Sequence, residues 1–261
     1  MGDRIMKKKS QVTVFVIIAI IIVAILLIVF YQPLKGLFVG TTTENFVPST
    51  CIQNAVKEAV NLTMSHGGKI NPTLFFRYNN QTLDYLCYTM DWYRTCVMQN
   101  PLLKQSIEAE AQEYSQKKID DCFNSAFSKL ESKGYNLQIS GTRKAVISLE
   151  PGKIVVKPDM SISITRAEEP KKIVGSDNLL TEIKSNSYDI VMIASSIQNF
   201  EARYGDSVID SYMAIYPNIR IEKIKQSDGT KVYIISDRNT KEILQFATRS
   251  LAWPPGLATG V

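Results

Sequence analysis

The chain has 261 residues and a formal net charge of +5, which is concentrated at the N-terminus. There, Arg4 and three lysines at positions 7–9 accompany a single acid, Asp3, whereas the rest of the chain carries 26 basic and 24 acidic side chains. Because a nucleic-acid-binding surface needs a concentrated basic face, this near-neutral balance excludes nucleic acid as a partner.

Residues 12–31 form an uncharged apolar run that predicts a transmembrane helix. Twenty helical residues rise about 30 Å, which is the thickness of the hydrocarbon core of a bilayer. A cleaved secretory signal is the competing interpretation, but its apolar region is usually about 7–15 residues long. Basic residues precede the run, and only Lys35 closely follows it. The positive-inside rule therefore predicts a single-pass protein of the cell membrane, with a cytoplasmic N-terminus and an extracytoplasmic C-terminal domain.

The predicted organisation has five parts. Residues 1–11 form a basic cytoplasmic tail, residues 12–31 the transmembrane helix, and residues 32–48 a stalk that contains proline, glycine and threonine. A disulfide-bearing α+β subdomain follows at 49–170, and a polar break separates it from a second α+β subdomain at 171–261.

Helical and strand patterns occur in blocks, which places the fold in the α+β class, with long helices packed on antiparallel β-meanders. Helices are predicted from about residue 49, with Thr50 and Gln53 as a capping box, and from residue 100. A long helix is predicted at 177–204 and a shorter one at 207–216. Short strands are expected at 137–139, 145–149, 154–156 and 160–164, and a hairpin with a third strand at 219–224, 232–235 and 243–248.

Four cysteines, Cys51, Cys87, Cys96 and Cys122, all lie after the apolar run. An even number in an oxidising exterior predicts two disulfides rather than a zinc site, because the chain has no C-x-x-C motif and a single histidine, His66. Of the three possible connectivities we favour Cys87–Cys96 with Cys51–Cys122. The first bridge closes a short segment, and the second joins the first turn of one helix to the apolar face of another.

Two N-x-S/T triplets, at Asn61 and Asn80, are candidate glycosylation sites in the same part of the chain. Each triplet is a weak signal alone, but both lie on the side of the membrane that is predicted to be extracytoplasmic.

The sequence contains no arrangement typical of catalysis. His66 follows Ser65, but a hydroxyl nucleophile needs a base that is held by a third group. The phosphate-binding, dinucleotide-binding and zinc-protease motifs are missing. The neighbouring acids Asp120 and Asp121 point about 100° apart on a helix, which is typical of a solvated face. We therefore predict no catalytic residue, no metal ligand and no cofactor.

The aromatic residues Tyr85, Tyr88, Trp92 and Tyr93 crowd the segment that contains the two middle cysteines. Packing around a disulfide-closed loop is the favoured interpretation, and a binding surface is the alternative. The tail at 253–256, with its two prolines, is expected to be loose.

Residues 9–15, KSQVTVF, resemble the start of archaeal class III signal segments, which are the leaders of type IV pilin-like proteins. In those leaders a basic residue and a small residue precede a glutamine, with Ser or Thr two positions later, and Lys9, Ser10, Gln11 and Thr13 match this pattern. Phe15 stands where the family carries the glutamate implied in subunit registration. The layout of residues 7–165 also resembles uncharacterised single-pass surface proteins of small-genome archaea.

These features predict a membrane-anchored cell-surface protein that is not an enzyme and whose C-terminal domain has a binding or structural role. The lipid bilayer is an expected partner, with envelope proteins or further copies of the chain beside it. The alternatives are a processed pilin-like filament subunit, in which Gln11 or a nearby residue becomes the first residue, and a membrane-anchored thiol enzyme.

Overall fold

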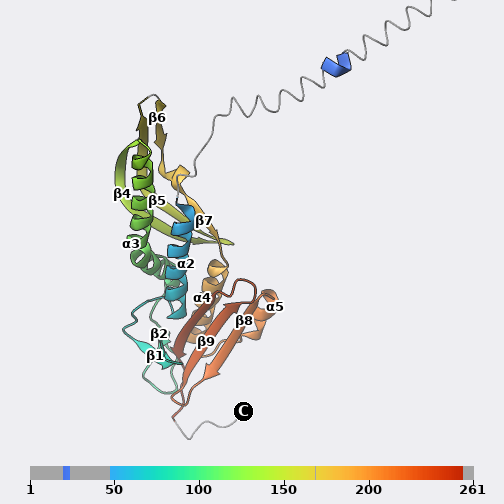
Figure 1. The fold of residues 1–261 in the computed structure, drawn as a ribbon. Helices are drawn as coiled ribbons and strands as arrows, with labels where there is room; N and C mark the ends of the chain where they lie inside the picture. Colours follow the sequence, from blue (N-terminus) through green and yellow to red (C-terminus); the bar gives the residue numbers. More distant parts are fainter. Residues whose placement is uncertain (1–19, 24–47, 168, 255–261) are drawn as a thin grey trace, which may run out of the picture. The chain divides into compact units, whose positions relative to one another are not determined.

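The computed structural model describes residues 20–23, 48–167 and 169–254. Residues 1–46 and 47–261 fall into two separate compact units, and the second contains the fold shown in Figure 1. In chain order its elements are α2 (Ser49–Ser65), β1 (Phe75–Tyr78), β2 (Gln81–Tyr88), β3 (Val97–Met98), α3 (Leu103–Ser132), β4 (Asn136–Glu150), β5 (Lys153–Arg166), β6 (Glu169–Val174), the 3-10 helix η1 (Ser176–Leu179), β7 (Thr181–Lys184), α4 (Ser187–Tyr204), α5 (Asp210–Ile215), β8 (Ile219–Lys225), β9 (Thr230–Asp237) and β10 (Ile243–Arg249).

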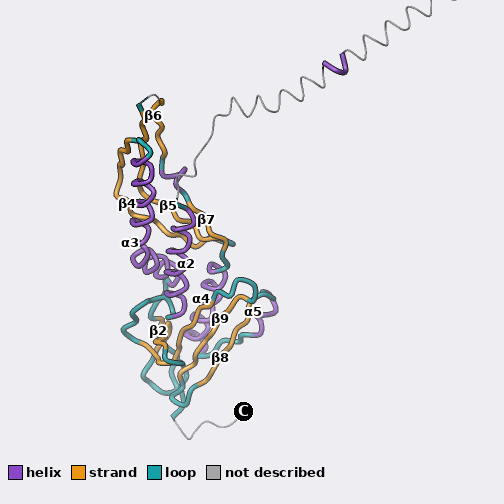
Figure 2. The backbone as a smooth tube through the Cα atoms, viewed as in Figure 1, coloured by secondary structure: helices purple, strands orange, loops and turns teal. Residues whose placement is uncertain are grey.

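The helices α2 and α3 pack against each other, and Figure 2 shows them side by side. Apolar side chains recur at three- and four-residue spacing on both helices, so each buries one continuous stripe. Ile52, Val56 and Val60 are buried on α2, and Ile107 and Phe123 are buried on α3. The rest of each stripe extends this core toward the two sheets.

The strands form two sheets that are antiparallel except for one pair. One sheet has the order β4-β5-β6, with β7 also paired to β5, and the other has the order β1-β2-β10-β9-β8, with β3 paired to β2. Strands from both sides of residue 170 therefore share each sheet. The parallel pair is β10 with β2, in which Ala247 lies opposite Tyr85. This pairing brings the end of the last strand beside the segment that contains Cys87 and Cys96.

The predicted membrane-spanning helix is the main correction to the sequence analysis. Among the described residues, no helix is both long and apolar enough to cross a membrane. Of the predicted span only residues 20–23 are described, and they are helical. The helix α4 carries Asp189, Glu201 and Arg203, and charged side chains are costly in hydrocarbon.

This finding contradicts the membrane-spanning part of the predicted fold class and the single-pass localisation deduced from it. The α+β class and the antiparallel sheets are present. Residues 1–19, which include the predicted tail and the leader-like residues, lie outside the described residues, as do residues 24–47 of the predicted span and stalk.

A second correction concerns the long helix predicted at 177–204. The helix α4 begins only at Ser187, and the segment before it forms η1 and the short strand β7. Ile183 of β7 lies opposite Ile154 of β5, so pairing with a distant strand buries Ile183, which the helical pattern had counted. The predicted capping box is also wrong, because α2 starts without a side-chain cap.

Candidate functional site

Both disulfides favoured by the sequence are present. Cys51 on α2 bonds to Cys122 on the buried face of α3, with the two Cα atoms 5.9 Å apart. Cys87 of β2 bonds to Cys96, just before β3, with the Cα atoms 5.4 Å apart. All four sulfur atoms are therefore paired, and a thiol reaction would require one bridge to be reduced.

The histidine lies at the C-terminal end of α2, where it contacts the helix backbone. His66 Nδ1 lies 2.9 Å from the carbonyl oxygen of Leu62 and 3.1 Å from Ser65 Oγ. The Ser65 hydroxyl donates a hydrogen bond to the same Leu62 oxygen, at 2.8 Å. Because the last carbonyls of a helix lack partners within the helix, these contacts satisfy the helix end.

The other residues singled out from the sequence lie on separate surfaces. Asn61 is exposed on α2, and Asn80 is exposed in the turn between β1 and β2. Asp121 is exposed on α3, and the Asp120 carboxylate accepts a hydrogen bond from Gln116 Nε2 at 3.0 Å. Within the described part of the chain, no hydrogen bond or ion pair joins these residues to one another.

Exposed aromatic and apolar side chains gather where the Cys87–Cys96 loop meets the segment that follows β10. We call this the aromatic surface and define it by four side chains whose exposed fractions are 37% for Trp92, 50% for Tyr93, 37% for Leu251 and 58% for Trp253. The Tyr93 and Trp253 rings meet edge to face, with their centroids 4.9 Å apart. The geometry is one that aromatic pairs prefer, so the two rings support each other while both remain exposed.

Two residues of the aromatic surface hold left-handed backbone conformations. The φ angle is 61° at Tyr93 and 46° at Leu251. Reciprocal backbone bonds hold this geometry, because the Tyr93 N–H donates to the Ala252 carbonyl at 3.0 Å and the Leu251 N–H donates to the Arg94 carbonyl at 2.7 Å. For bulky residues such angles cost on the order of 1–3 kcal/mol each and persist only where the surroundings over-determine them.

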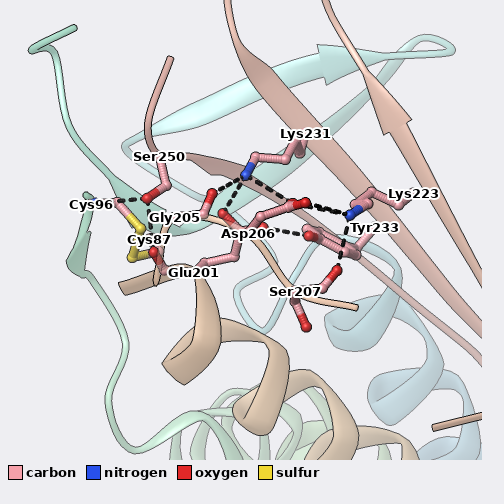
Figure 3. Close-up of polar contacts among 10 residues, drawn as sticks. All are labelled: Cys87, Cys96, Glu201, Gly205, Asp206, Ser207, Lys223, Lys231, Tyr233 and Ser250. Carbon is pink, nitrogen blue, oxygen red and sulfur yellow. Dashed lines mark hydrogen bonds and ion pairs between the residues drawn. A yellow bond between two sulfur atoms is a disulfide. The ribbon is translucent and has the colours of Figure 1, made fainter. Parts of the chain in front are cut away.

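A buried cluster of charged groups joins the end of α4 to β9, as Figure 3 shows. Glu201, on the last turn of α4, accepts a hydrogen bond from Lys231 Nζ at 2.7 Å and a second from the Tyr233 hydroxyl. Lys231 also donates to the Gly205 carbonyl at the end of the helix. All three side chains are buried, so the lysine neutralises Glu201 and caps the negative end of α4 at the same time.

The cluster continues toward solvent through Asp206 and Lys223. Lys223 Nζ lies 3.0 Å from both Asp206 carboxylate oxygens and donates to the Ser207 carbonyl at 2.9 Å (Figure 3). Asp206 Oδ1 also lies 3.3 Å from Lys231 Nζ. Two cations thus alternate with two carboxylates, and the charges of the cluster cancel.

One serine ties the charged cluster to the disulfide loop. The Ser250 hydroxyl donates to the backbone carbonyl of Glu201 at 2.8 Å and accepts the Cys96 N–H at 2.9 Å (Figure 3). The end of α4, the end of β10 and the loop are therefore held as one rigid support for the aromatic surface.

The pKa shifts in the cluster follow from burial and from the charges around each group. Burial raises the pKa of Glu201 above its ordinary value despite the opposing effect of Lys231. Burial and the charge of Glu201 raise the pKa of Tyr233. Burial alone would raise the pKa of Asp206, but the hydrogen bond from Lys223 and the charge of Lys231 outweigh it and lower that pKa. The central contact of the cluster is thus the buried ion pair between Lys231 and Glu201, which has a structural role.

Sequence reasoning missed this cluster and the contribution of the tail. Lys231 and Tyr233 alternate with apolar residues along β9, and Glu201 lies four residues after Ile197 on the apolar stripe of α4, so a search for polar groups on buried faces would have found them. The expectation of a loose tail fails at Trp253, which packs on Tyr93.

The comparisons with known proteins add no relative. No protein-family model matches this chain, and neither the curated proteins nor the solved structures yield a match.

Proposed function

We propose that this protein is a non-enzymatic binding protein and that it recognises a partner protein through the aromatic surface. The observation that carries the proposal is the exposed Tyr93–Trp253 pair, in which Tyr93 has a left-handed backbone conformation and donates its N–H to the Ala252 carbonyl. A glycine at position 93 would adopt the same backbone angle at a lower cost, so a tyrosine there favours a role for the exposed ring.

The composition of the surface also fits a protein partner. Tryptophan, tyrosine and arginine are enriched among the residues that contribute most to the binding energy of protein interfaces. Trp92, Tyr93, Arg94 and Trp253 supply this set within one loop and one tail. Val97, the residue after Cys96, is a further apolar side chain of this segment, at 68% exposed.

The test is co-purification of the full-length protein from the cells that make it, with three forms of the chain in parallel. The surface variant carries Tyr93→Ser and Trp253→Ser. The control variant carries Ile173→Ser, which removes an apolar side chain of β6 that is even more exposed. We expect a stoichiometric partner with the wild type and with the control, and its loss with the surface variant.

Mass measurement of the two intact disulfides and circular dichroism verify that each variant is folded. A partner that stays bound to the folded surface variant would refute the proposal. Loss of the partner with both variants would equally refute it, because the loss would then not depend on the aromatic surface.

A further inference from the structure

Arg249 places a buried positive charge directly against the aromatic surface. Its exposed fraction is 7%, and its Cζ atom lies 4.4 Å from the centroid of the Trp92 ring. Its Nε donates to the Asp228 carbonyl at 3.0 Å, and its Nη1 donates to the Thr89 carbonyl at 2.5 Å. Both acceptors are uncharged carbonyl oxygens, so these bonds fix the orientation of the guanidinium group without neutralising its charge.

No carboxylate of the described residues forms an ion pair with Arg249. The nearby acid Asp228 gives Arg249 its backbone carbonyl, while its carboxylate accepts the Thr230 N–H at 2.9 Å and the Thr230 hydroxyl at 3.0 Å. At the rim, the Asp91 carboxylate lies 3.7 Å from the Arg94 guanidinium instead. Buried charges in proteins are ordinarily paired, which makes this guanidinium an exception in the described structure.

Two of the three guanidinium nitrogens of Arg249, Nε and Nη1, have acceptors among the described residues, whereas Nη2 has none there. A carboxylate can accept a charge-assisted hydrogen bond from Nη2 and supply the missing negative charge. The site is therefore complementary in charge to an acid whose neighbouring side chain is apolar.

We propose that the aromatic surface recognises an acidic segment of the partner protein, in which a carboxylate approaches Arg249 Nη2 and an adjacent aromatic side chain packs on Tyr93 and Trp253. This inference rests on the proposed function and specifies its partner. The carboxylate gains a charge-assisted hydrogen bond in a low-dielectric setting, and the ring gains an apolar contact. A carboxylate alone would not use the exposed rings, and an aromatic side chain alone would not use the charge of Arg249.

The test uses the intrinsic fluorescence of the full chain. Its only two tryptophans, Trp92 and Trp253, both belong to the aromatic surface. With excitation selective for tryptophan, the chain is titrated with N-acetylphenylalanine, with its amide, and with inorganic phosphate. We expect a saturable change with the carboxylate probe and at least about tenfold weaker binding of the amide, which corresponds to about 1.4 kcal/mol. Phosphate should leave the signal unchanged.

Two arginine variants form the second arm. Arg249→Lys keeps the charge but removes Nη2 and the fixed guanidinium plane, so it should weaken binding of N-acetylphenylalanine toward that of the amide. Arg220→Lys, on an exposed arginine of β8 that is not part of the aromatic surface, should leave the binding unchanged. The comparison of the two probes needs no variant, so it remains decisive if Arg249→Lys disturbs folding.

Each other outcome overturns the inference. Equal binding of acid and amide would remove the role of Arg249 while leaving the aromatic surface as a binding site. A response to phosphate as strong as that to the carboxylate would indicate a general anion site. Absence of any response would reject the acidic segment, whereas the co-purification experiment tests the proposed function independently.

Discussion

Asp84 of β2 is a buried carboxyl group whose ionisation should make the stability of the fold depend on pH. Its exposed fraction is 2%, its Oδ2 lacks a hydrogen-bond partner, and the nearest cation, Lys69, lies 3.7 Å away at Nζ. Burial, which Lys69 only partly offsets, raises the pKa of Asp84 from 3.8 to about 6. The perturbation we choose is Asp84→Asn, which mimics the protonated acid and cannot ionise.

The sign follows from proton uptake. Between the unfolded pKa and the raised folded pKa, the native state binds more protons than the unfolded state, so stability falls as pH rises through this window. A shift from 3.8 to about 6 corresponds to about 3 kcal/mol of destabilisation once the pH is well above 6. At pH 4 the same calculation gives a destabilisation of only about 0.5 kcal/mol. The unfolding free energy of the asparagine variant, measured relative to that of the wild type, should therefore increase by about 2.5 kcal/mol between pH 4 and pH 8.

The assay is urea denaturation of both proteins at the two pH values, which cancels the titration of all other groups. Asp91→Asn is the matched control, because Asp91 is an exposed acid of the next loop, and this substitution should change the unfolding free energy by less than about 0.5 kcal/mol at either pH. A difference between Asp84→Asn and wild type that does not change with pH would refute the reasoning, since it would mean that the burial of Asp84 does not oppose its ionisation.

Two further predictions concern the buried charged cluster and the two disulfides. Lys231→Met should lower the unfolding free energy by about 3–5 kcal/mol in urea denaturation, because it leaves the Glu201 carboxylate buried without a cation, and adding Glu201→Gln should restore part of the loss. A loss below about 0.5 kcal/mol would show that the pair is not needed. Replacing Cys51 and Cys122 by serine opens a bridge of sequence separation 71 and should cost about 4 kcal/mol, against about 2.5 kcal/mol for the bridge of separation 9. Guanidinium denaturation measures both losses, and the reverse order would contradict the chain-entropy argument.

Local patterns in the sequence were sufficient for much of the fold. The apolar stripes of α2 and α3 and the Asp228-Gly229 turn between β8 and β9 predicted the elements that the structure contains. The pairing of the four cysteines followed from the same elements, because helix faces and a short loop limit which sulfur atoms can meet. Such patterns involve residues only a few positions apart, so they can be recognised in the sequence without knowledge of the tertiary structure.

Other features depended on contacts between distant residues. The segment that pairs with β5 as β7 had a helical pattern, and the bulge between Gly141 and Ala145 joins the separately predicted runs into the long strand β4. In each case hydrogen bonds to another strand determine the conformation, and the local sequence does not indicate which strand that is.

The candidate site also depends on contacts between residues that are distant in the sequence. The sequence alone determined that aromatic residues crowd a disulfide loop, but Tyr93 and Trp253 meet only because β10 pairs in parallel with β2. The same pairing sets Arg249 against Trp92, and the packing of α4 on the sheet brings Glu201 to Lys231. Sequence fixes which side chains are present and their local elements, whereas the surface that they form depends on long-range pairing, whose free energy comes from burial shared among strands far apart in the chain.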